Sequence, residues 1–451
     1  MSDIERKLGG LGIGIPDLLL PREMDLGKWA TVACDQYTQD REYWEKARVA
    51  TDNRASTLRV IFPEVYLEDG DRAKRIGDIH MDMGNYLYGG VLGEARRGFV
   101  YLERDTPFNK GRRGLVVAVD LERYSWSRDS RPLIRPTEGT VAERLPPRME
   151  VRRNALLETS HIIMLIDDDA DALLPGLGES AKKSPPVYSG DLMLDSGAIS
   201  GWFLDREADW EYLAEGLAKL ADRALTRYST APGEEPFLFA VGDGNHSLAS
   251  AKEVWEEYKS GFAKTQAGRN GELPVHPCRY AIVEIESIYD RAIRFEPIHR
   301  VVFGLDFDRA MTLLSALPGF SGREVTGREE LVRLVAEPVK GNRFGLASGN
   351  RYALIETSAG GISTASLQPL LDRAVAAPSI DYIHGEDELF RLALAPEKPA
   401  TGILLPPVQK DGFFETVAQT GPLPRKSFSM GEACEKRFYI ECRQLFDDGG
   451  K

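Results

Sequence analysis

The chain has 451 residues, a net charge of −13 and a pI near 5.2, with 42% hydrophobic and 28% charged residues. This length exceeds one ordinary hydrophobic core, so about two or three domains are expected, and the acidic balance argues against a nucleic-acid partner. No apolar run approaches the roughly 20 residues that cross a bilayer, and the first residues lack the layout of a signal peptide. We therefore expect a cytoplasmic protein without a membrane partner.

Cysteine and histidine spacing excludes the usual preformed metal sites. The four cysteines, Cys34, Cys278, Cys434 and Cys442, are widely spread and form no CxxC pair. Neither a structural zinc site nor a disulfide framework is expected from them. The six histidines show no metal-ligand spacing either.

Hydrophobic periodicity predicts the elements of the first part of the chain. The predicted helices span 40–49, 71–86, 151–158 and 208–228. The predicted strands span 99–102, 115–119, 161–166 and 237–241, with a hairpin formed by 192–195 and 200–204. The stretch 170–190, which contains proline, glycine, serine and lysine, is predicted to be an exposed loop.

A polar stretch then predicts a domain boundary. Glycine, glutamine and lysine between 261 and 277 are typical of a linker. Beyond it, 279–288 and 292–303 resemble paired strands, helices and strands alternate, and 436–445 is again strand-like. We predict a first domain at 1–260, a linker at 261–277 and a second α+β domain at 278–451. The fold class is mixed α+β.

The most informative segment is an apolar run that ends in a glycine-rich polar turn. Residues 237–241 predict a buried strand, and Leu248, Ala251, Val254, Trp255 and Tyr258 fall on one face of a following helix. A strand, a glycine turn and a helix start leave backbone N–H groups pointing outward, where the helix dipole favours an anion such as phosphate.

A structural interpretation of the same turn stays open. Gly242 and Gly244 fit a tight turn with positive φ, while Asp243 or Asn245 fits a helix cap, and His246 can be an ordinary first-turn residue. Capping and catalysis use the same lone pairs, so spacing alone does not separate the two interpretations.

The segment Gly242-Asp243-Gly244-Asn245-His246-Ser247-Leu248-Ala249 resembles the Asp-Gly-His-His-Arg-x-x-Ala signature of the ParB/sulfiredoxin-like superfamily, which includes free-serine kinases. The order of elements is similar to that of a family of unknown function within or near that superfamily. That family has a His-Glu-x-Thr segment before the glycine motif and a Pro-x-Lys-Ser segment near its end. The matching segments here are Pro136-Thr137-Glu138-Gly139-Thr140 and Pro424-Arg425-Lys426-Ser427.

The resemblance implies a ParB/sulfiredoxin-like core that binds ATP or ADP with Mg²⁺ and transfers a phosphoryl group to a small hydroxylated metabolite. It implies Glu138 as the base, Asp243 as the metal or acceptor ligand, and His246 as a phosphate contact. The residues it implies for holding phosphate are Gly242, Gly244, Asn245, Ser247, Arg144, Arg148 and Lys426.

Two positions depart from the signature. Asn245 replaces its first histidine and Ser247 replaces its arginine, so a bidentate phosphate clamp is lost. Three hypotheses follow: a serine-kinase-like phosphotransferase, a nucleotide hydrolase that drives a conformational switch, and a protein that binds a nucleotide or another ligand without catalysis.

Overall fold

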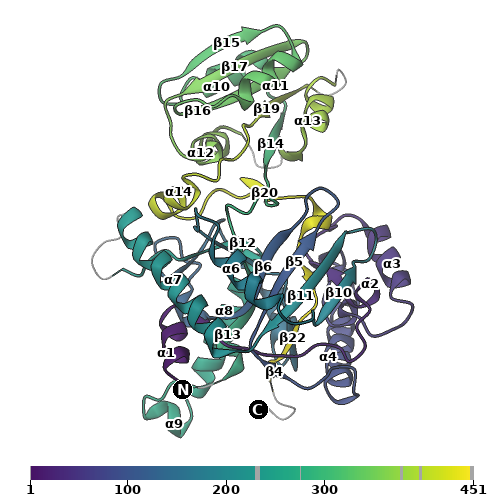
Figure 1. Ribbon diagram of the computed structural model, residues 1–451. Helices are drawn as coiled ribbons and strands as arrows, with labels where there is room; N and C mark the ends of the chain where they lie inside the picture. The colour runs from purple at the N-terminus through teal and green to yellow at the C-terminus, as the bar shows by residue number, and fades with distance from the viewer. Residues whose placement is uncertain (1, 229–233, 275, 376–378, 396–398, 447–451) are drawn as a thin grey trace. The chain divides into compact units, whose positions relative to one another are not determined.

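A computed structural model describes residues 2–228, 234–274, 276–375, 379–395 and 399–446. The chain forms two compact units: Met1–Ile293 together with Glu432–Lys451, and Arg294–Gly431. Each unit combines helices with a sheet (Figure 1), which confirms the predicted mixed α+β class. Within the described residues, none of the helices has both the length and the apolar character that a membrane span requires.

The first unit is built on one mixed sheet with the strand order β10-β11-β5-β6-β13-β9-β12-β7, and β1 pairs with β6 at one side. Its strands are β1 (Ile13–Gly14), β5 (Phe99–Asp105), β6 (Arg112–Asp120), β7 (Ile134–Pro136), β9 (Ile163–Ile166), β10 (Tyr188–Asp191), β11 (Ala198–Leu204), β12 (Phe239–Asp243) and β13 (Tyr280–Ser287). Valine, isoleucine and leucine make the central strands almost fully buried, as expected where both faces of a sheet are covered.

Helices surround this sheet. They are α1 (Asp3–Gly10), α2 (Leu26–Trp29), α3 (Arg41–Ala50), α4 (Arg72–Tyr88), α5 (Leu145–Arg152), α6 (Leu173–Ala181), α7 (Glu207–Arg227), α8 (Asn245–Phe262) and α9 (Gln266–Arg269). The helices α3, α4, α7 and α8 lie where periodicity predicts helices. In α8 the predicted apolar face is buried through Leu248, Ala251, Val254 and Trp255.

The last described residues return to the first unit rather than completing the second. The strand β21 (Phe438–Tyr439) pairs with β3 (Thr31–Val32), and β22 (Cys442–Gln444) pairs with β8 (Leu157–Thr159). A further short pair joins β2 (Asp17–Leu18) to β4 (Arg96–Arg97). In Figure 1 the yellow C-terminal stretch accordingly runs among elements of the first unit.

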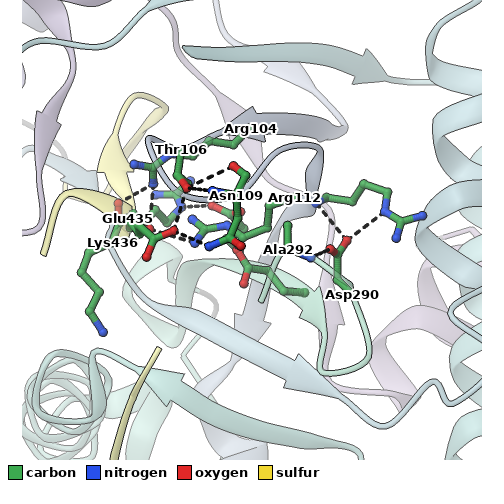
Figure 2. A network of polar contacts seen from close by, with 12 residues as sticks. Arg104, Thr106, Asn109, Arg112, Asp290, Ala292, Glu435 and Lys436 are labelled. Carbon is green, nitrogen blue, oxygen red and sulfur yellow. Dashed lines mark hydrogen bonds and ion pairs between the residues drawn. The ribbon is translucent and has the colours of Figure 1, made fainter. Parts of the chain in front are cut away.

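Buried polar contacts hold this returning segment in place. Thr106 and Asn109 donate to the Glu435 carboxylate at 2.6 and 2.9 Å, and Arg104 and Arg112 donate to the Glu435 carbonyl at 3.0 and 2.8 Å (Figure 2). The neighbouring Arg437 is buried and pairs with Glu284 at 2.7 Å and with Glu441 at 2.8 Å. Buried charges need such partners because desolvation otherwise costs several kcal/mol per ion.

The second unit contains its own sheet with the order β15-β17-β16-β19-β14-β18, and β20 pairs with β14. Its strands are β14 (Phe295–Phe303), β15 (Ser321–Val325), β16 (Asn342–Ser348), β17 (Arg351–Thr357), β18 (Ile380–His384), β19 (Ala400–Leu404) and β20 (Phe428–Met430). Its helices are α10 (Phe307–Leu314), α11 (Arg328–Ala336), α12 (Ser363–Ala374), α13 (Glu386–Ala393) and α14 (Phe413–Thr420).

The predicted boundary at 261–277 is wrong. This segment lies inside the first unit because β13, which follows it, pairs with both β6 and β9 of the first sheet. The strands β13 and β14 were predicted to pair, yet they belong to different sheets. The strand-like 436–445 was predicted for the second domain and instead belongs to the first unit.

Three local predictions also fail. The helix predicted at 151–158 is α5, which begins at Leu145 because Pro146 and Pro147 suit a first helical turn, and it ends at Arg152 before β8. The predicted loop at 170–190 contains α6, whose buried Leu173, Leu174 and Leu177 form one helical face despite Pro175 and Gly176 between them. The first strand of the predicted hairpin is also displaced, to 188–191.

We predict that Arg437→Met lowers the free energy of unfolding by about 3 kcal/mol, because Glu284 and Glu441 would stay buried without their cation. Urea denaturation measures this loss. The control is Arg391→Met, which removes an exposed pair with Glu388 and should change stability by less than about 1 kcal/mol. Equal effects of the two substitutions would contradict the structural role given to Arg437.

Candidate functional site

The parallel pairing of β7 with β12 brings the segment of Glu138 to the glycine turn. Ile134 and Pro136 lie opposite Phe239 and Val241, so both strands end at the same edge of the sheet. Thr137 Oγ1 donates to the Val241 carbonyl at 2.6 Å. Farther along, the Val141 N–H donates to His246 Nε2 at 3.2 Å. The half-buried Glu138 lies between these two anchors.

The glycine turn joins β12 to α8 in a conformation that requires glycine. Gly244 has φ of 77°, and a Cβ atom there would lie 3.0 Å from Ile162 Cγ1. Gly244 occupies the N-cap position of α8, and among the described residues no side chain forms a capping bond there. The Asn245 amide instead donates to the Val241 carbonyl at 3.3 Å. The capping interpretation of Asp243 and Asn245 is therefore not supported.

Asp243 and Lys436 face each other beside this turn. Asp243 Oδ2 lies 3.8 Å from Lys436 Nζ, and in the described part of the chain this oxygen accepts no hydrogen bond. Burial raises the pKa of the Asp243 carboxyl, an effect that the charge of Lys436 opposes and that of Asp35 reinforces. Asp243 is therefore a partly buried carboxylate, with Oδ2 fully buried, that a cation or a hydrogen-bond donor would stabilise.

His161 connects this pair to a second acidic residue. Its Nε2 lies 3.6 Å from Asp35 Oδ2 and 3.3 Å from Ser247 Oγ, while Nδ1 lies 2.5 Å from the Tyr439 hydroxyl. Burial opposes the charged imidazolium, but the nearby acids, first Asp35 and then Asp243 and Glu64, together outweigh it and raise the pKa of His161. Burial likewise opposes the Asp35 carboxylate, and His161 lowers the pKa of Asp35 below its ordinary value. The two residues form an ion pair in which His161 is buried and Asp35 is partly exposed.

This arrangement is not a nucleophile relay of the Ser-His-Asp kind. Such a relay needs the serine and the aspartate on opposite ring nitrogens. Here Ser247 and Asp35 both approach Nε2, and Tyr439 occupies Nδ1. The geometry therefore gives His161 an electrostatic role rather than that of a base for Ser247.

The remaining predicted residues lie in different surroundings. Arg148 forms an ion pair with the partly buried Glu64, and burial raises the pKa of Glu64 against the charge of that arginine. Arg144 is exposed in a short 3-10 helix that precedes α5. Lys426 belongs to the second unit, so its predicted phosphate contact stays a prediction. The bond from Val141 occupies Nε2 of His246, and this nitrogen cannot also donate to a phosphate.

Sequence reasoning missed most of the cations and acids that surround the turn. The sequence patterns assign no role to Asp35, place His161 only in a predicted strand, and place Lys436 and Tyr439 in a strand of the second domain. One available signal was the acidic residue in Ala33-Cys34-Asp35-Gln36-Tyr37. Another was the run of charged side chains from Glu435 to Arg437 beside the apolar Phe438.

We predict that Asp35→Asn lowers the free energy of unfolding by about 2 kcal/mol at about pH 6, since one partner of a partly exposed ion pair is removed. The raised pKa of His161 means that its contribution is complete below the unfolded value of about 6.5 and is lost as pH rises through the folded value. Urea denaturation at several pH values should therefore show the difference from wild type shrinking by about pH 9.

The control for this series is Asp129→Asn, at an exposed position. Its effect should be small and should not vary with pH. A deficit of Asp35→Asn that grows as pH rises would contradict the ion pair.

Comparison with solved structures gives low scores. A free serine kinase in complex with AMP is 13% identical with a TM-score of 0.36, covering 72% of this chain and 90% of the kinase. A conserved hypothetical protein from Pyrococcus furiosus is 13% identical with a TM-score of 0.32 at the same coverage. SbnI with a C-terminal truncation, from Staphylococcus aureus, is 9% identical with a TM-score of 0.35, covering 70% of this chain and 82% of SbnI. Scores of this size establish neither a shared fold nor a shared activity.

The sequence comparisons identify the family of the chain but not its function. No curated protein matches the chain. A family model described as a protein of unknown function, DUF1015, matches residues 17–374, which is most of the sequence. The chain therefore belongs to the DUF1015 family.

Proposed function

We propose that the first unit binds a nucleotide such as ATP or ADP and transfers a phosphoryl group to a small hydroxylated metabolite. One observation carries the proposal: the segment around Glu138 is anchored at Thr137 and Val141 to the strand and helix that flank the glycine turn. An acidic side chain and a helix N-terminus thus belong to one edge of one sheet. Phosphoryl transfer needs little more than positioned phosphates, cations and a base.

The start of α8 is the phosphate site in this proposal. The positive φ of Gly244 and its close approach to Ile162 support a turn shaped by backbone rather than by side chains. Without a capping side chain, the first N–H groups of an 18-residue helix are suited to an anion, and the helix dipole adds to that preference.

Lys436 and His161 replace the positive charge of the signature arginine. Ser247 stands in the arginine position and contacts His161. Lys436 lies beside Asp243, and the raised pKa of His161 favours its cationic form. Of the predicted cations, Arg148 is already paired with Glu64. We therefore assign phosphate charge compensation to Lys436 and His161.

Magnesium fits this site only together with the phosphates of the nucleotide. Among the described residues, no three His, Cys, Asp or Glu side chains are grouped to hold a metal. Asp243 Oδ2, which has no hydrogen-bond partner among the residues that the structure describes, is the one protein ligand we assign to it. The ion would supply positive charge to the phosphate oxygens when bound, a role that needs only one or two carboxylates from the protein.

Glu138 is assigned the role of general base. In the step, the bond between the terminal phosphorus of the nucleotide and its bridging oxygen breaks, and a bond forms from the acceptor oxygen to that phosphorus. The acceptor proton passes to the Glu138 carboxylate, and the shortened nucleotide leaves with the bridging oxygen.

The serine at position 247 favours one alternative, nucleotide binding without transfer. Ser247 cannot supply the charge of an arginine, and His246 Nε2 is occupied by the Val141 N–H. Loss of a transition-state clamp lowers turnover without abolishing ground-state binding.

We predict that ATP or ADP with Mg²⁺ raises the melting temperature of the wild type, since a ligand at a hundred times its Kd stabilises by about 2.7 kcal/mol. In Gly244→Ala this rise should disappear, because the turn cannot keep its backbone with a Cβ there. The matched control is Gly261→Ala in the same helix, where a Cβ meets no atom within 4 Å. Nucleotide stabilisation that is the same in both variants would exclude the glycine turn as the phosphate site.

We predict that Glu138→Gln keeps nucleotide binding but lowers phosphoryl transfer by about 10²–10⁴-fold, the range for loss of a general base. Binding is measured by thermal shift, and transfer by ³¹P NMR of a mixture of small alcohols and amino acids. Glu143→Gln, exposed in the same segment, serves as the control and should leave both unchanged. A wild type that binds nucleotide but transfers nothing would favour the alternative of binding without transfer.

A further inference from the structure

A cavity of about 130 Å³ lies next to the start of α8. Ser247 and Ser250 of that helix line it, together with His161 and Tyr439. Much of the remaining wall is apolar and comes from the segment before α4, from α4 and α5, and from the strands near the C-terminal return. These apolar residues are Val60, Ile61, Phe62, Leu67, Met83, Val151, Leu157 and Leu445.

Polar side chains also reach the wall of the cavity, but several are already committed to partners within the protein. Arg148 pairs with Glu64, and Arg152 with Glu158 at 2.6 Å. The Tyr439 hydroxyl contacts His161 Nδ1, and Ser250 donates to the His246 carbonyl at 2.8 Å. Each charge named here is therefore balanced by an opposite charge within the wall. A charged ligand group would have to compete with these pairs, whereas an uncharged apolar group would not.

The volume of the cavity limits the size of the apolar group that it can bind. An apolar cavity of about 150 Å³ admits benzene. The present volume therefore fits a branched chain of about five carbons or a small ring. Burial of such a group is favourable in proportion to its apolar area.

From this lining, we infer that the cavity binds the uncharged apolar tail of a small alcohol. This inference rests on the proposed function: the alcohol is the phosphoryl acceptor, and its hydroxyl lies toward Ser247 and the glycine turn. It narrows the acceptor class from hydroxylated metabolites in general to alcohols with a short branched or aromatic tail. Serine and glycerol, which have no such tail, are poor ligands for this cavity.

The test measures binding of 3-methyl-1-butanol and benzyl alcohol by isothermal titration calorimetry, first without nucleotide. Leu67→Trp places a larger ring at a partly buried position of the cavity wall. Val65→Trp is the control, because Val65 is a partly buried residue of the short helix Glu64–Tyr66, which ends just before Leu67, and does not line the cavity. Val151→Phe is a second filling variant from α5, used if Leu67→Trp does not fold.

The inference predicts that both alcohols bind the wild type and Val65→Trp, and that Leu67→Trp or Val151→Phe weakens them at least about tenfold through steric exclusion. L-serine and glycerol should bind more weakly than either alcohol. No binding of the alcohols to the wild type, equal binding to the filling variants, or tighter binding of L-serine would each overturn it.

Nucleotide titrations keep the two proposals distinguishable. Alcohol binding that is lost on filling the cavity, in a protein that no nucleotide stabilises, would retain the apolar site and reject the phosphotransferase. Nucleotide binding and phosphoryl transfer to L-serine that Leu67→Trp does not affect would retain the phosphotransferase and reject the apolar site.

Discussion

The geometry of the proposed site depends on the parallel pairing of β7 with β12. Parallel neighbours end at the same edge of a sheet, so residues more than a hundred positions apart in the sequence meet there. The hydrogen bonds from Thr137 to Val241 and from Val141 to His246 extend this pairing beyond the strands. The proposed site combines the polar residues that follow each strand: backbone donors from the start of α8 and the carboxylate of Glu138 from the segment after β7.

The electrostatics of this site depend on a second long-range constraint, the return of residues 432–446 to the first unit. That return brings Lys436 to Asp243 and Tyr439 to His161. It is held by buried groups that are costly to leave unpaired, including Arg437 between Glu284 and Glu441. The second unit is therefore inserted in the sequence between Ile293 and Glu432, and the two segments on either side of it fold together as the first unit.

Local patterns in the sequence predict much of the fold. Of the proposed site, they predict the glycine turn. Periodicity predicts α7 and α8 because their apolar faces are regular, and the glycine spacing correctly indicates the turn at Gly244. The domain boundary could not be predicted in this way, because a polar sequence such as 261–277 is typical both of a linker between domains and of a surface segment within one domain. Asp35, His161 and Lys436 come from three distant segments, and only tertiary contacts bring them together.

Hydrogen–deuterium exchange with and without ATP and Mg²⁺ tests the central claim most directly. If the nucleotide phosphates lie on the start of α8 and face the segment of Glu138, amides in 242–250 and in 137–144 should both exchange more slowly in its presence. Slower exchange confined to the second unit, or no change in either of these two segments, would contradict the account.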